Sequence, residues 1–227
     1  MKPSELAAQV AARKAATLSK LQPVKVAARA AVEQNWKKSR ELKEAIKENQ
    51  NERELIHGHN FDLFPTPPEL AAEMVRRARI GQGDRVLEPS AGTGRLAKAA
   101  KDAGGWVTCV EFNNSLVGRL LDMGFEVICK DFMEYKQPAR VDAVVMNPPF
   151  SNGADIDHVR HAYDLLTEGN LIAIMSEGSF YRSDRKATAF REWLDSVGGE
   201  SEQLPAGTFK QSGTNVSTRL VTIYKRL

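Results

Sequence analysis

The 227-residue sequence predicts an α/β fold, in which helices flank a mostly parallel β-sheet and a helical extension precedes the sheet. Residues 85–96 read as a short apolar strand, a turn of small residues and the start of a helix, which is where a doubly wound sheet binds its ligand. Continuous apolar runs at 141–146 and 170–176 have the character of buried strands. Further elements are expected as strands at 106–111, 125–132 and 217–224 and as helices at 69–79, 157–167 and 186–197.

Charge divides the chain into two predicted parts, a basic helical extension at 1–59 and a catalytic domain at 60–227. Residues 1–60 hold 12 basic and 7 acidic side chains, whereas the remaining 167 residues hold 20 and 22. The extension is rich in Ala, Lys, Glu and Gln and has no Gly or Pro from Val24 to Leu55, a composition that favours a long helix. Its basic side chains could lie along phosphates or on a solvated helix face; the candidates for phosphate contact are Lys37, Lys38, Arg40 and Lys43.

A proline-rich element separates the extension from the first strand. Thr66 can cap the helix at 69–79, with Pro67 and Pro68 in its first turn. Phe64 precedes this cap by two residues. The element is therefore expected at minimum to start a helix.

A glycine turn follows the first strand. Glu88 ends this strand, and Gly92 and Gly94 allow the backbone to turn tightly and to approach a ligand, with the first N–H groups of the next helix facing the same space. Ala97 stands where the dinucleotide fingerprint has its third Gly or Ala, so a nicotinamide-binding fold remains an alternative on this feature alone.

Two more acidic residues occupy the ends of the next apolar runs. Glu111 ends the run 106–111, and Asp131 and Phe132 end the run 125–132. Because parallel strands present their carboxyl ends on one rim, these acids are expected to join Glu88 around a single site.

The fourth apolar run, 141–146, is followed directly by Asn147, Pro148, Pro149 and Phe150. Asn147 offers a side-chain oxygen, Pro148 offers a carbonyl but has no N–H, and Phe150 supplies an apolar plate. Two hydrogen-bond acceptors at one point suit a planar NH2 group.

The Asn-Pro-Pro-Phe motif resembles that of the S-adenosylmethionine-dependent amino-methyltransferases, whose motif binds the nitrogen to be methylated. The segment from Glu88 to Gly94 resembles the cofactor loop of class I methyltransferases, and Phe64-Pro65-Thr66-Pro67 is similar to the element that precedes this loop in gamma-type N6-adenine DNA methyltransferases. Over residues 60–227 the chain resembles small enzymes of this kind carried by phages and mobile elements, without the target-recognition domain of restriction-modification relatives.

The resemblance implies a Rossmann-like class I fold with a seven-stranded sheet, and S-adenosylmethionine as cofactor. It implies that Glu111 binds the ribose, that Asp131 and Phe132 contact the adenine of the cofactor, and that Phe150 stacks on the substrate base. Phe209 is the candidate for stacking on the far face of that base. The implied cofactor-binding residues are Phe64, Thr66, Glu88, Ser90, Gly92, Gly94, Glu111, Asp131, Phe132 and Asn147. The implied catalytic residues are Asn147, Pro148, Pro149 and Phe150.

Three other functions stay open at this point: an RNA adenine N6-methyltransferase, a glutamine methyltransferase acting on protein, and a non-catalytic nucleic-acid-binding protein. No metal is expected, because Cys109 and Cys129 lie in predicted buried strands and the four histidines lack zinc spacing with them. The sequence has no run of 18 apolar residues and no secretion signal, so no membrane partner and a cytoplasmic location are expected, in a bacterium or a phage-infected host.

Overall fold

The computed structural model describes residues 63–136, 140–210 and 216–226, together with Lys37, Arg40 and Thr214. Lys37 and Arg40 are helical and exposed. The other two candidates for phosphate contact, Lys38 and Lys43, lie outside the described residues, as does the predicted boundary between the extension and the domain. The role of the extension therefore stays a prediction.

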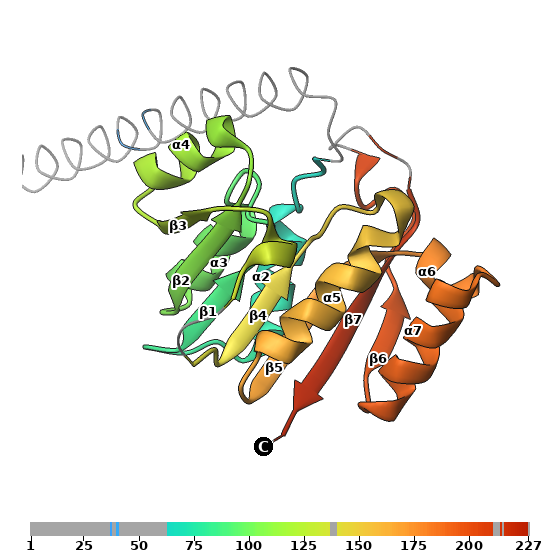
Figure 1. Cartoon of the computed structure of the whole chain (residues 1–227). Helices are drawn as coiled ribbons and strands as arrows, with labels where there is room; N and C mark the ends of the chain where they lie inside the picture. Colours follow the sequence, from blue (N-terminus) through green and yellow to red (C-terminus); the bar gives the residue numbers. More distant parts are fainter. Residues whose placement is uncertain are drawn as a thin grey trace, which may run out of the picture. The chain divides into compact units, whose positions relative to one another are not determined.

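The described part of the chain from Leu63 onward forms one seven-stranded sheet in the order β3-β2-β1-β4-β5-β7-β6 (Figure 1). Neighbouring strands are parallel except around β7, which runs antiparallel to both β5 and β6. This confirms the mostly parallel sheet and the antiparallel last strand. The strands are β1 (Arg85–Glu88), β2 (Trp106–Glu111), β3 (Glu126–Cys129), β4 (Ala143–Met146), β5 (Gly169–Ser176), β6 (Glu200–Gln203) and β7 (Thr218–Lys225).

Alternate strand residues face two different helical layers. On one face Val86, Cys109 and Val145 pack with α2 and α3, and on the other Leu87 and Val144 pack with α5 and α7. In Figure 1, α5 lies in front of the sheet and α2 and α3 lie behind it. The helices are α2 (Pro68–Ala78), α3 (Arg95–Asp102), α4 (Asn114–Asp122), α5 (Ala154–Leu165), α6 (Gly178–Tyr181) and α7 (Arg185–Ser196).

The order of the strands fixes the place of the site. The chain leaves β1 toward β2 and β3 on one side, and then returns to β4 on the other side of β1. Loops after β1 and β4 therefore part in opposite directions and leave a crevice at their carboxyl ends, where open α/β sheets bind ligands. Glu88 and Asn147 lie at this point of the sheet.

Three local predictions need correction. Thr66 does not cap α2: Pro67 occupies the N-cap position without a side-chain hydrogen bond, and the Thr66 hydroxyl accepts from Asn147 instead. The third strand ends at Cys129 rather than Phe132, because Asp131 caps a short 3-10 turn, η1 (Phe132–Glu134). Cys109 is buried as expected, but Cys129 is exposed because β3 is an edge strand.

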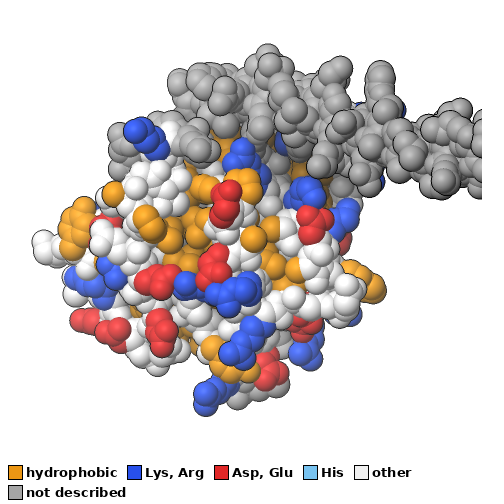
Figure 2. Space-filling model, turned by 180° about the vertical axis from the view of Figure 1, so that it is seen from behind, with side chains coloured by type: hydrophobic (Ala, Val, Ile, Leu, Met, Phe, Trp, Pro, Cys, Tyr) orange, Lys and Arg blue, Asp and Glu red, His pale blue; other side chains and the backbone are white. Residues whose placement is uncertain are grey.

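Two further features concern the surface. On the face opposite the view of Figure 1, basic and acidic side chains lie side by side around apolar atoms (Figure 2). On α2, for example, Glu73 pairs with both Arg76 and Arg77. None of the described helices combines the length and hydrophobicity needed to cross a bilayer.

Candidate active site

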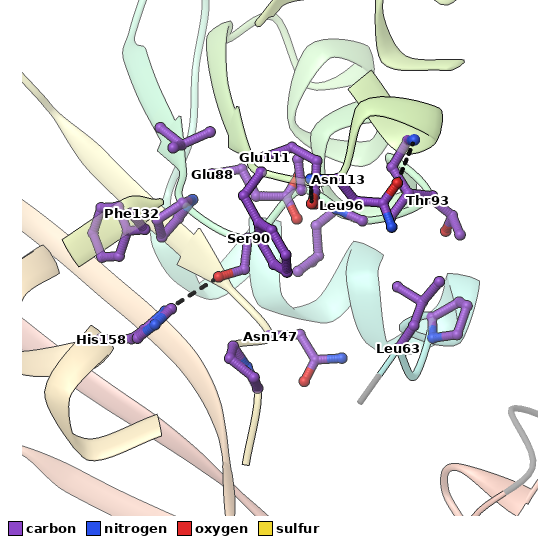
Figure 3. Close-up of a pocket in the computed structure, with 18 of the residues that line it drawn as sticks. Leu63, Glu88, Ser90, Thr93, Leu96, Glu111, Asn113, Phe132, Asn147 and His158 are labelled. Atoms are coloured by element: carbon purple, nitrogen blue, oxygen red, sulfur yellow. Dashed lines mark hydrogen bonds between the residues drawn. The ribbon is translucent and has the colours of Figure 1, made fainter. Parts of the chain in front are cut away.

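A pocket of about 420 Å³ opens at the carboxyl ends of β1 to β4. In Figure 3, Glu88 and Glu111 lie next to each other, and Asn147 lies across the pocket from them. The pocket brings together ten of the residues predicted for the site, namely Phe64, Thr66, Glu88, Ser90, Gly92, Glu111, Asp131, Phe132, Asn147 and Pro149. The crevice expected from strand order is therefore also where the motif residues meet.

The Glu111 carboxylate braces the wall of the pocket. Its Oε2 accepts from the Gly92 N–H at 2.8 Å, and its Oε1 accepts from the Asn113 N–H at 2.9 Å. Gly92 has φ = 51°, and a Cβ at this position would lie 3.1 Å from Leu63 Cδ1. A glycine at this position therefore allows the left-handed backbone and leaves room for the Leu63 side chain. Glu111 is buried, so its remaining acceptor capacity is aimed at a sheltered space.

Glu88 is a buried acid with an unsatisfied oxygen. Its side chain is 2% exposed, and its Oε2 has no hydrogen-bond partner among the described residues. Burial raises the pKa of Glu88 well above its ordinary value, the Ala97 N–H partly opposes this effect, and the neighbouring Glu111 adds to it. A buried carboxyl oxygen without a hydrogen-bond partner lowers the stability of the fold. At the wall of a pocket it suits a ligand that carries a hydrogen-bond donor or a positive charge.

A cluster of rings forms the opposite end of the pocket. The Phe132 ring is buried and packs against His158 with 5.4 Å between ring centroids. His158 Nδ1 lies 3.4 Å from Ser90 Oγ, a contact drawn in Figure 3. Burial lowers the pKa of His158, although Asp131 and Asp157 oppose this effect. The neutral imidazole is therefore favoured, and it can exchange a hydrogen bond with Ser90 in either role.

The Asn147 amide is oriented by the element that precedes α2. Its Nδ2 donates to the Phe64 carbonyl oxygen at 2.7 Å and to Thr66 Oγ1 at 3.2 Å. Both amide hydrogens are thereby used, so the side chain presents Oδ1 as its remaining polar atom. The oxygen and nitrogen ends of an amide side chain are told apart by their hydrogen-bond partners. The Phe64 carbonyl and the Thr66 hydroxyl fix the position of Nδ2, and the other end of the amide, Oδ1, is therefore an acceptor toward the pocket.

The rest of the motif is placed around Asn147. Phe150 is half-buried, and its ring is nearly parallel to that of Phe64, with 6.2 Å between centroids and 19° between planes. Pro149 lines the pocket, whereas Pro148, which is buried, and Phe150 are not among its lining residues. Phe64 thus joins the motif twice, through its carbonyl oxygen and through its ring.

Two predicted residues have other places. Phe209 is 1% exposed in the core with α2 and α3, so the prediction that it stacks on a substrate base is wrong for this arrangement: its ring is enclosed by apolar neighbours. Gly94 does not line the pocket. It begins α3 with φ = 84°, and a Cβ there would lie 2.9 Å from Leu120 Cδ2, so glycine lets α3 and α4 approach each other.

Several lining residues were missed by the sequence interpretation. Phe112 and Asn113 follow Glu111 directly and could have been found from their place after a strand end. Phe112 is 57% exposed, unusual for a large apolar side chain beside a pocket. Arg95, at the start of α3, donates to the Thr66 carbonyl oxygen at 3.3 Å. His158 lies inside α5, where the sequence carries no signal of its contact with Ser90.

No model of a protein family matches the sequence. A curated rRNA methyltransferase from Streptomyces thermotolerans is 33% identical over 109 residues, which is 46% of this chain. The match covers 36% of that protein, so the chain spans about a third of the length of the relative.

Solved structures resemble most of the described domain. A putative RNA methyltransferase from Pyrococcus horikoshii superposes with a TM-score of 0.55 and 23% identity over 72% of this chain and 87% of that one. The M protein of the type I restriction enzyme EcoKI gives a TM-score of 0.62 with 15% identity, over 73% and 44% of the two chains.

A putative class I S-adenosylmethionine-dependent methyltransferase from Listeria monocytogenes gives a TM-score of 0.60 with 15% identity, over 75% of this chain and 64% of that one. These likenesses agree with the fold described above. The chain has the Rossmann-like fold of the class I methyltransferases.

Proposed function

We propose that this protein transfers a methyl group from S-adenosylmethionine to the N6 amino group of adenine in nucleic acid, with DNA as the main candidate substrate. The observation that carries the proposal is the orientation of Asn147. Its Nδ2 hydrogens are held by Phe64 and Thr66, so Oδ1 stands as an acceptor directly beside a pocket of cofactor size.

The residues of the pocket fit S-adenosylmethionine. Glu88 with its unpartnered oxygen and Glu111 give the pocket an acidic wall suited to the positive charge and hydroxyl donors of this molecule. Arg95 and the start of α3 offer donors for a carboxylate. Phe132 and the exposed Phe112 offer apolar faces for a flat ring system. When bound, the cofactor supplies an electrophilic methyl group on a sulfonium.

The role of the chain toward the acceptor follows from the chemistry of an aromatic amine. The lone pair of the adenine amino group is delocalised into the ring, so the nitrogen is a weak nucleophile. Hydrogen bonds from NH2 to Asn147 Oδ1 and to the Pro148 carbonyl oxygen favour positive charge developing on that nitrogen during attack. Phe150 offers its ring to the base, which in a duplex must first leave the stack at a cost of a few kcal/mol. The remaining rate enhancement comes from holding the amino group and the sulfonium methyl group in line with each other.

RNA is the second candidate substrate, and the rRNA methyltransferase from Streptomyces thermotolerans is the observation that favours it. The Asn-Pro-Pro-Phe motif would contact the base and not the sugar, so it suits both nucleic acids. Transfer to glutamine in a protein would use the same two acceptors.

The test is transfer of labelled methyl from S-adenosylmethionine to unmethylated duplex DNA, single-stranded DNA, ribosomal and transfer RNA, and cell protein, followed by nucleoside and amino-acid analysis. N6-methyladenine in DNA is the expected product. Label only in RNA or protein would move the substrate but keep the acceptor chemistry. Cofactor binding without transfer to any of these substrates would contradict the proposed activity.

A further inference from the structure

A carboxylate lies completely buried a few residues beyond the Asn-Pro-Pro-Phe motif. Asp155 is the second residue of α5 and is 0% exposed. Its Oδ2 accepts from the Ser176 N–H at 2.9 Å, from Ser176 Oγ at 3.0 Å and from Ser179 Oγ at 2.8 Å. All three donors are uncharged. They belong to the end of β5 and to α6, so Asp155 ties the chain that follows the motif to the neighbouring strand.

The Asp155 carboxyl group is held by several hydrogen bonds at once. One oxygen that receives three donors has no lone pair to spare, and hydrogen bonds to a charged acceptor are the strong ones. The position near the N-terminus of a 12-residue helix also favours negative charge. A buried carboxylate with no cation beside it is unfavourable unless hydrogen bonds replace its hydration. Losing any of these contacts should therefore destabilise the buried position of Asp155.

The segment held by Asp155 contains a left-handed turn. Asn152 has φ = 57° and Gly153 has φ = 70°, so two consecutive residues are left-handed. Few residue types adopt this conformation readily, and Gly and Asn are the two that do so most often. A Cβ at Gly153 would lie 3.2 Å from Arg182 Nη2, so the turn is also packed closely against the segment after α6.

The two ends of the motif loop, residues 147–153, are thus fixed in different ways. Asn147 follows β4, which is held between β1 and β5 in the centre of the sheet. The far end is fixed by Asp155 to the last residue of β5. Between these two anchors lie the Pro148 carbonyl and the Phe150 ring, whose places decide how an acceptor group is held.

We infer that Asp155 is a positioning residue: through Ser176 and Ser179 it holds the loop 147–153 in the conformation that aims the Pro148 carbonyl and Phe150 at the acceptor. The inference rests on the proposed function for its effect on turnover. Its effect on the loop is independent of that function. Asp155 itself touches neither cofactor nor substrate.

The first test is amide hydrogen exchange of the full chain with Asp155→Asn. The loop amides of residues 150–153 should exchange at least about tenfold faster than in the parent, since a hydrogen bond to a charged group is weakened at its anchor. Amides of residues 88–113, in the cofactor part of the pocket, should be unchanged.

Two variants on the same helix serve as controls. Asp164→Asn makes the same chemical change at an exposed position of α5. Val159→Ala removes apolar volume from a fully buried position of α5 and lowers stability without touching the loop anchor. Neither should accelerate exchange at 150–153. Parent-like exchange in Asp155→Asn, or equal acceleration in Val159→Ala, would overturn the inference whatever the enzymatic activity.

The second test uses turnover. Asp155→Asn should lower kcat roughly 10- to 100-fold through misplacement of the loop, with KM for S-adenosylmethionine within about twofold of the parent. Ser179→Ala, on α6, should give a smaller loss in the same direction. The double variant should lose less than the product of the single losses, because both changes act on one contact. Independent, multiplicative losses would contradict the assigned path. A parent that transfers no methyl group would contradict the proposed function and leave the exchange test to decide on Asp155.

Discussion

The two halves of the pocket differ in how their polar groups are used. On the β1 to β3 side, Glu88, Glu111 and Asp131 stand at or just beyond three successive strand ends, and the buried Glu88 keeps an oxygen without a partner. On the β4 side, Asn147 has both amide hydrogens engaged. Beyond the pocket lining, the Asp155 carboxylate accepts four hydrogen bonds, three at Oδ2 and one, from the Ile156 N–H, at Oδ1. In the proposed function, the first half binds a cationic, hydroxyl-bearing ligand, and the second provides acceptors for an NH2 group. Binding and reaction should therefore be separable by mutation.

The largest effect on the first half is expected from Glu111→Ala. The change removes the acceptor of the Gly92 and Asn113 N–H groups as well as a carboxylate of the pocket. The Kd for S-adenosylmethionine should rise roughly 100-fold, as expected for the loss of two charge-assisted hydrogen bonds. Titration calorimetry measures this. An unchanged Kd would remove Glu111 from the proposed cofactor site.

Phe150→Leu should affect the second half alone. Loss of the ring should lower kcat/KM for nucleic acid about 10-fold, since stacking of a base on an aromatic side chain is worth ~1–3 kcal/mol. The Kd for S-adenosylmethionine should stay at the parent value, because Phe150 is not among the residues that line the pocket. A matched control is Phe190→Leu, a core phenylalanine on α7. Equal losses in both variants would mean that the ring of Phe150 serves packing only.

Two basic residues beside the motif loop, Arg182 and Lys186, allow a test through the salt dependence of nucleic-acid binding. Arg182 and Lys186 lie against Gly153, and Lys186 Nζ also contacts the Asn152 carbonyl oxygen at 3.4 Å. Replacing both by Ala should weaken binding to nucleic acid about 3- to 10-fold and lower the dependence of log Kd on log salt by about one to two units. Fluorescence anisotropy at several salt concentrations measures the slope. An unchanged slope would place the phosphates elsewhere.

Glu88→Gln tests the unsatisfied acid. The raised pKa of Glu88 means that the protonated form is favoured in the folded state, so this carboxyl contributes stability at pH values below the ordinary glutamate pKa of about 4.3 and loses that contribution as pH rises through the raised pKa. Glutamine keeps the neutral form at all pH values. The Tm at pH 8 should therefore rise by roughly 2–4 °C, with little change at pH 4.

The same variant should bind S-adenosylmethionine less tightly, because a partner for its positive charge is lost. A Tm that is lower at pH 8 than that of the parent would show that the charged carboxylate stabilises the fold. Calorimetry in buffers of different ionisation enthalpy adds an internal check, since the parent should release a proton when the cation binds.

Much of the fold and of the site was predictable because its signals are local. Strand ends followed by Glu88, Glu111 and Asn147 are visible in the sequence, and parallel strands bring such residues to one rim. Asn147 as an acceptor was predicted from the residue type, whereas the reason for its orientation, the Phe64 carbonyl and Thr66 hydroxyl 83 and 81 positions away along the chain, is tertiary. The same contact explains why Thr66 does not cap α2.

The failures are likewise tertiary. Phe209 was expected on the rim, but apolar neighbours from distant elements enclose it. Cys129 was expected to be buried, and only its place on the edge strand exposes it. His158 contacts Ser90, 68 positions away, and Asp155 contacts Ser176, 21 positions away. Neither contact is visible as a sequence motif.

The most direct test of the separation between the two halves is one pair of measurements on Asn147→Ala. Removing the amide should lower methyl transfer at least about 100-fold, as expected when a donor or acceptor aimed at developing charge is lost. The Kd for S-adenosylmethionine, measured on the same sample, should stay within about threefold of the parent. Undiminished transfer would contradict the acceptor role of Asn147, and parallel losses of binding and transfer would contradict the division of the pocket into a binding half and a reacting half.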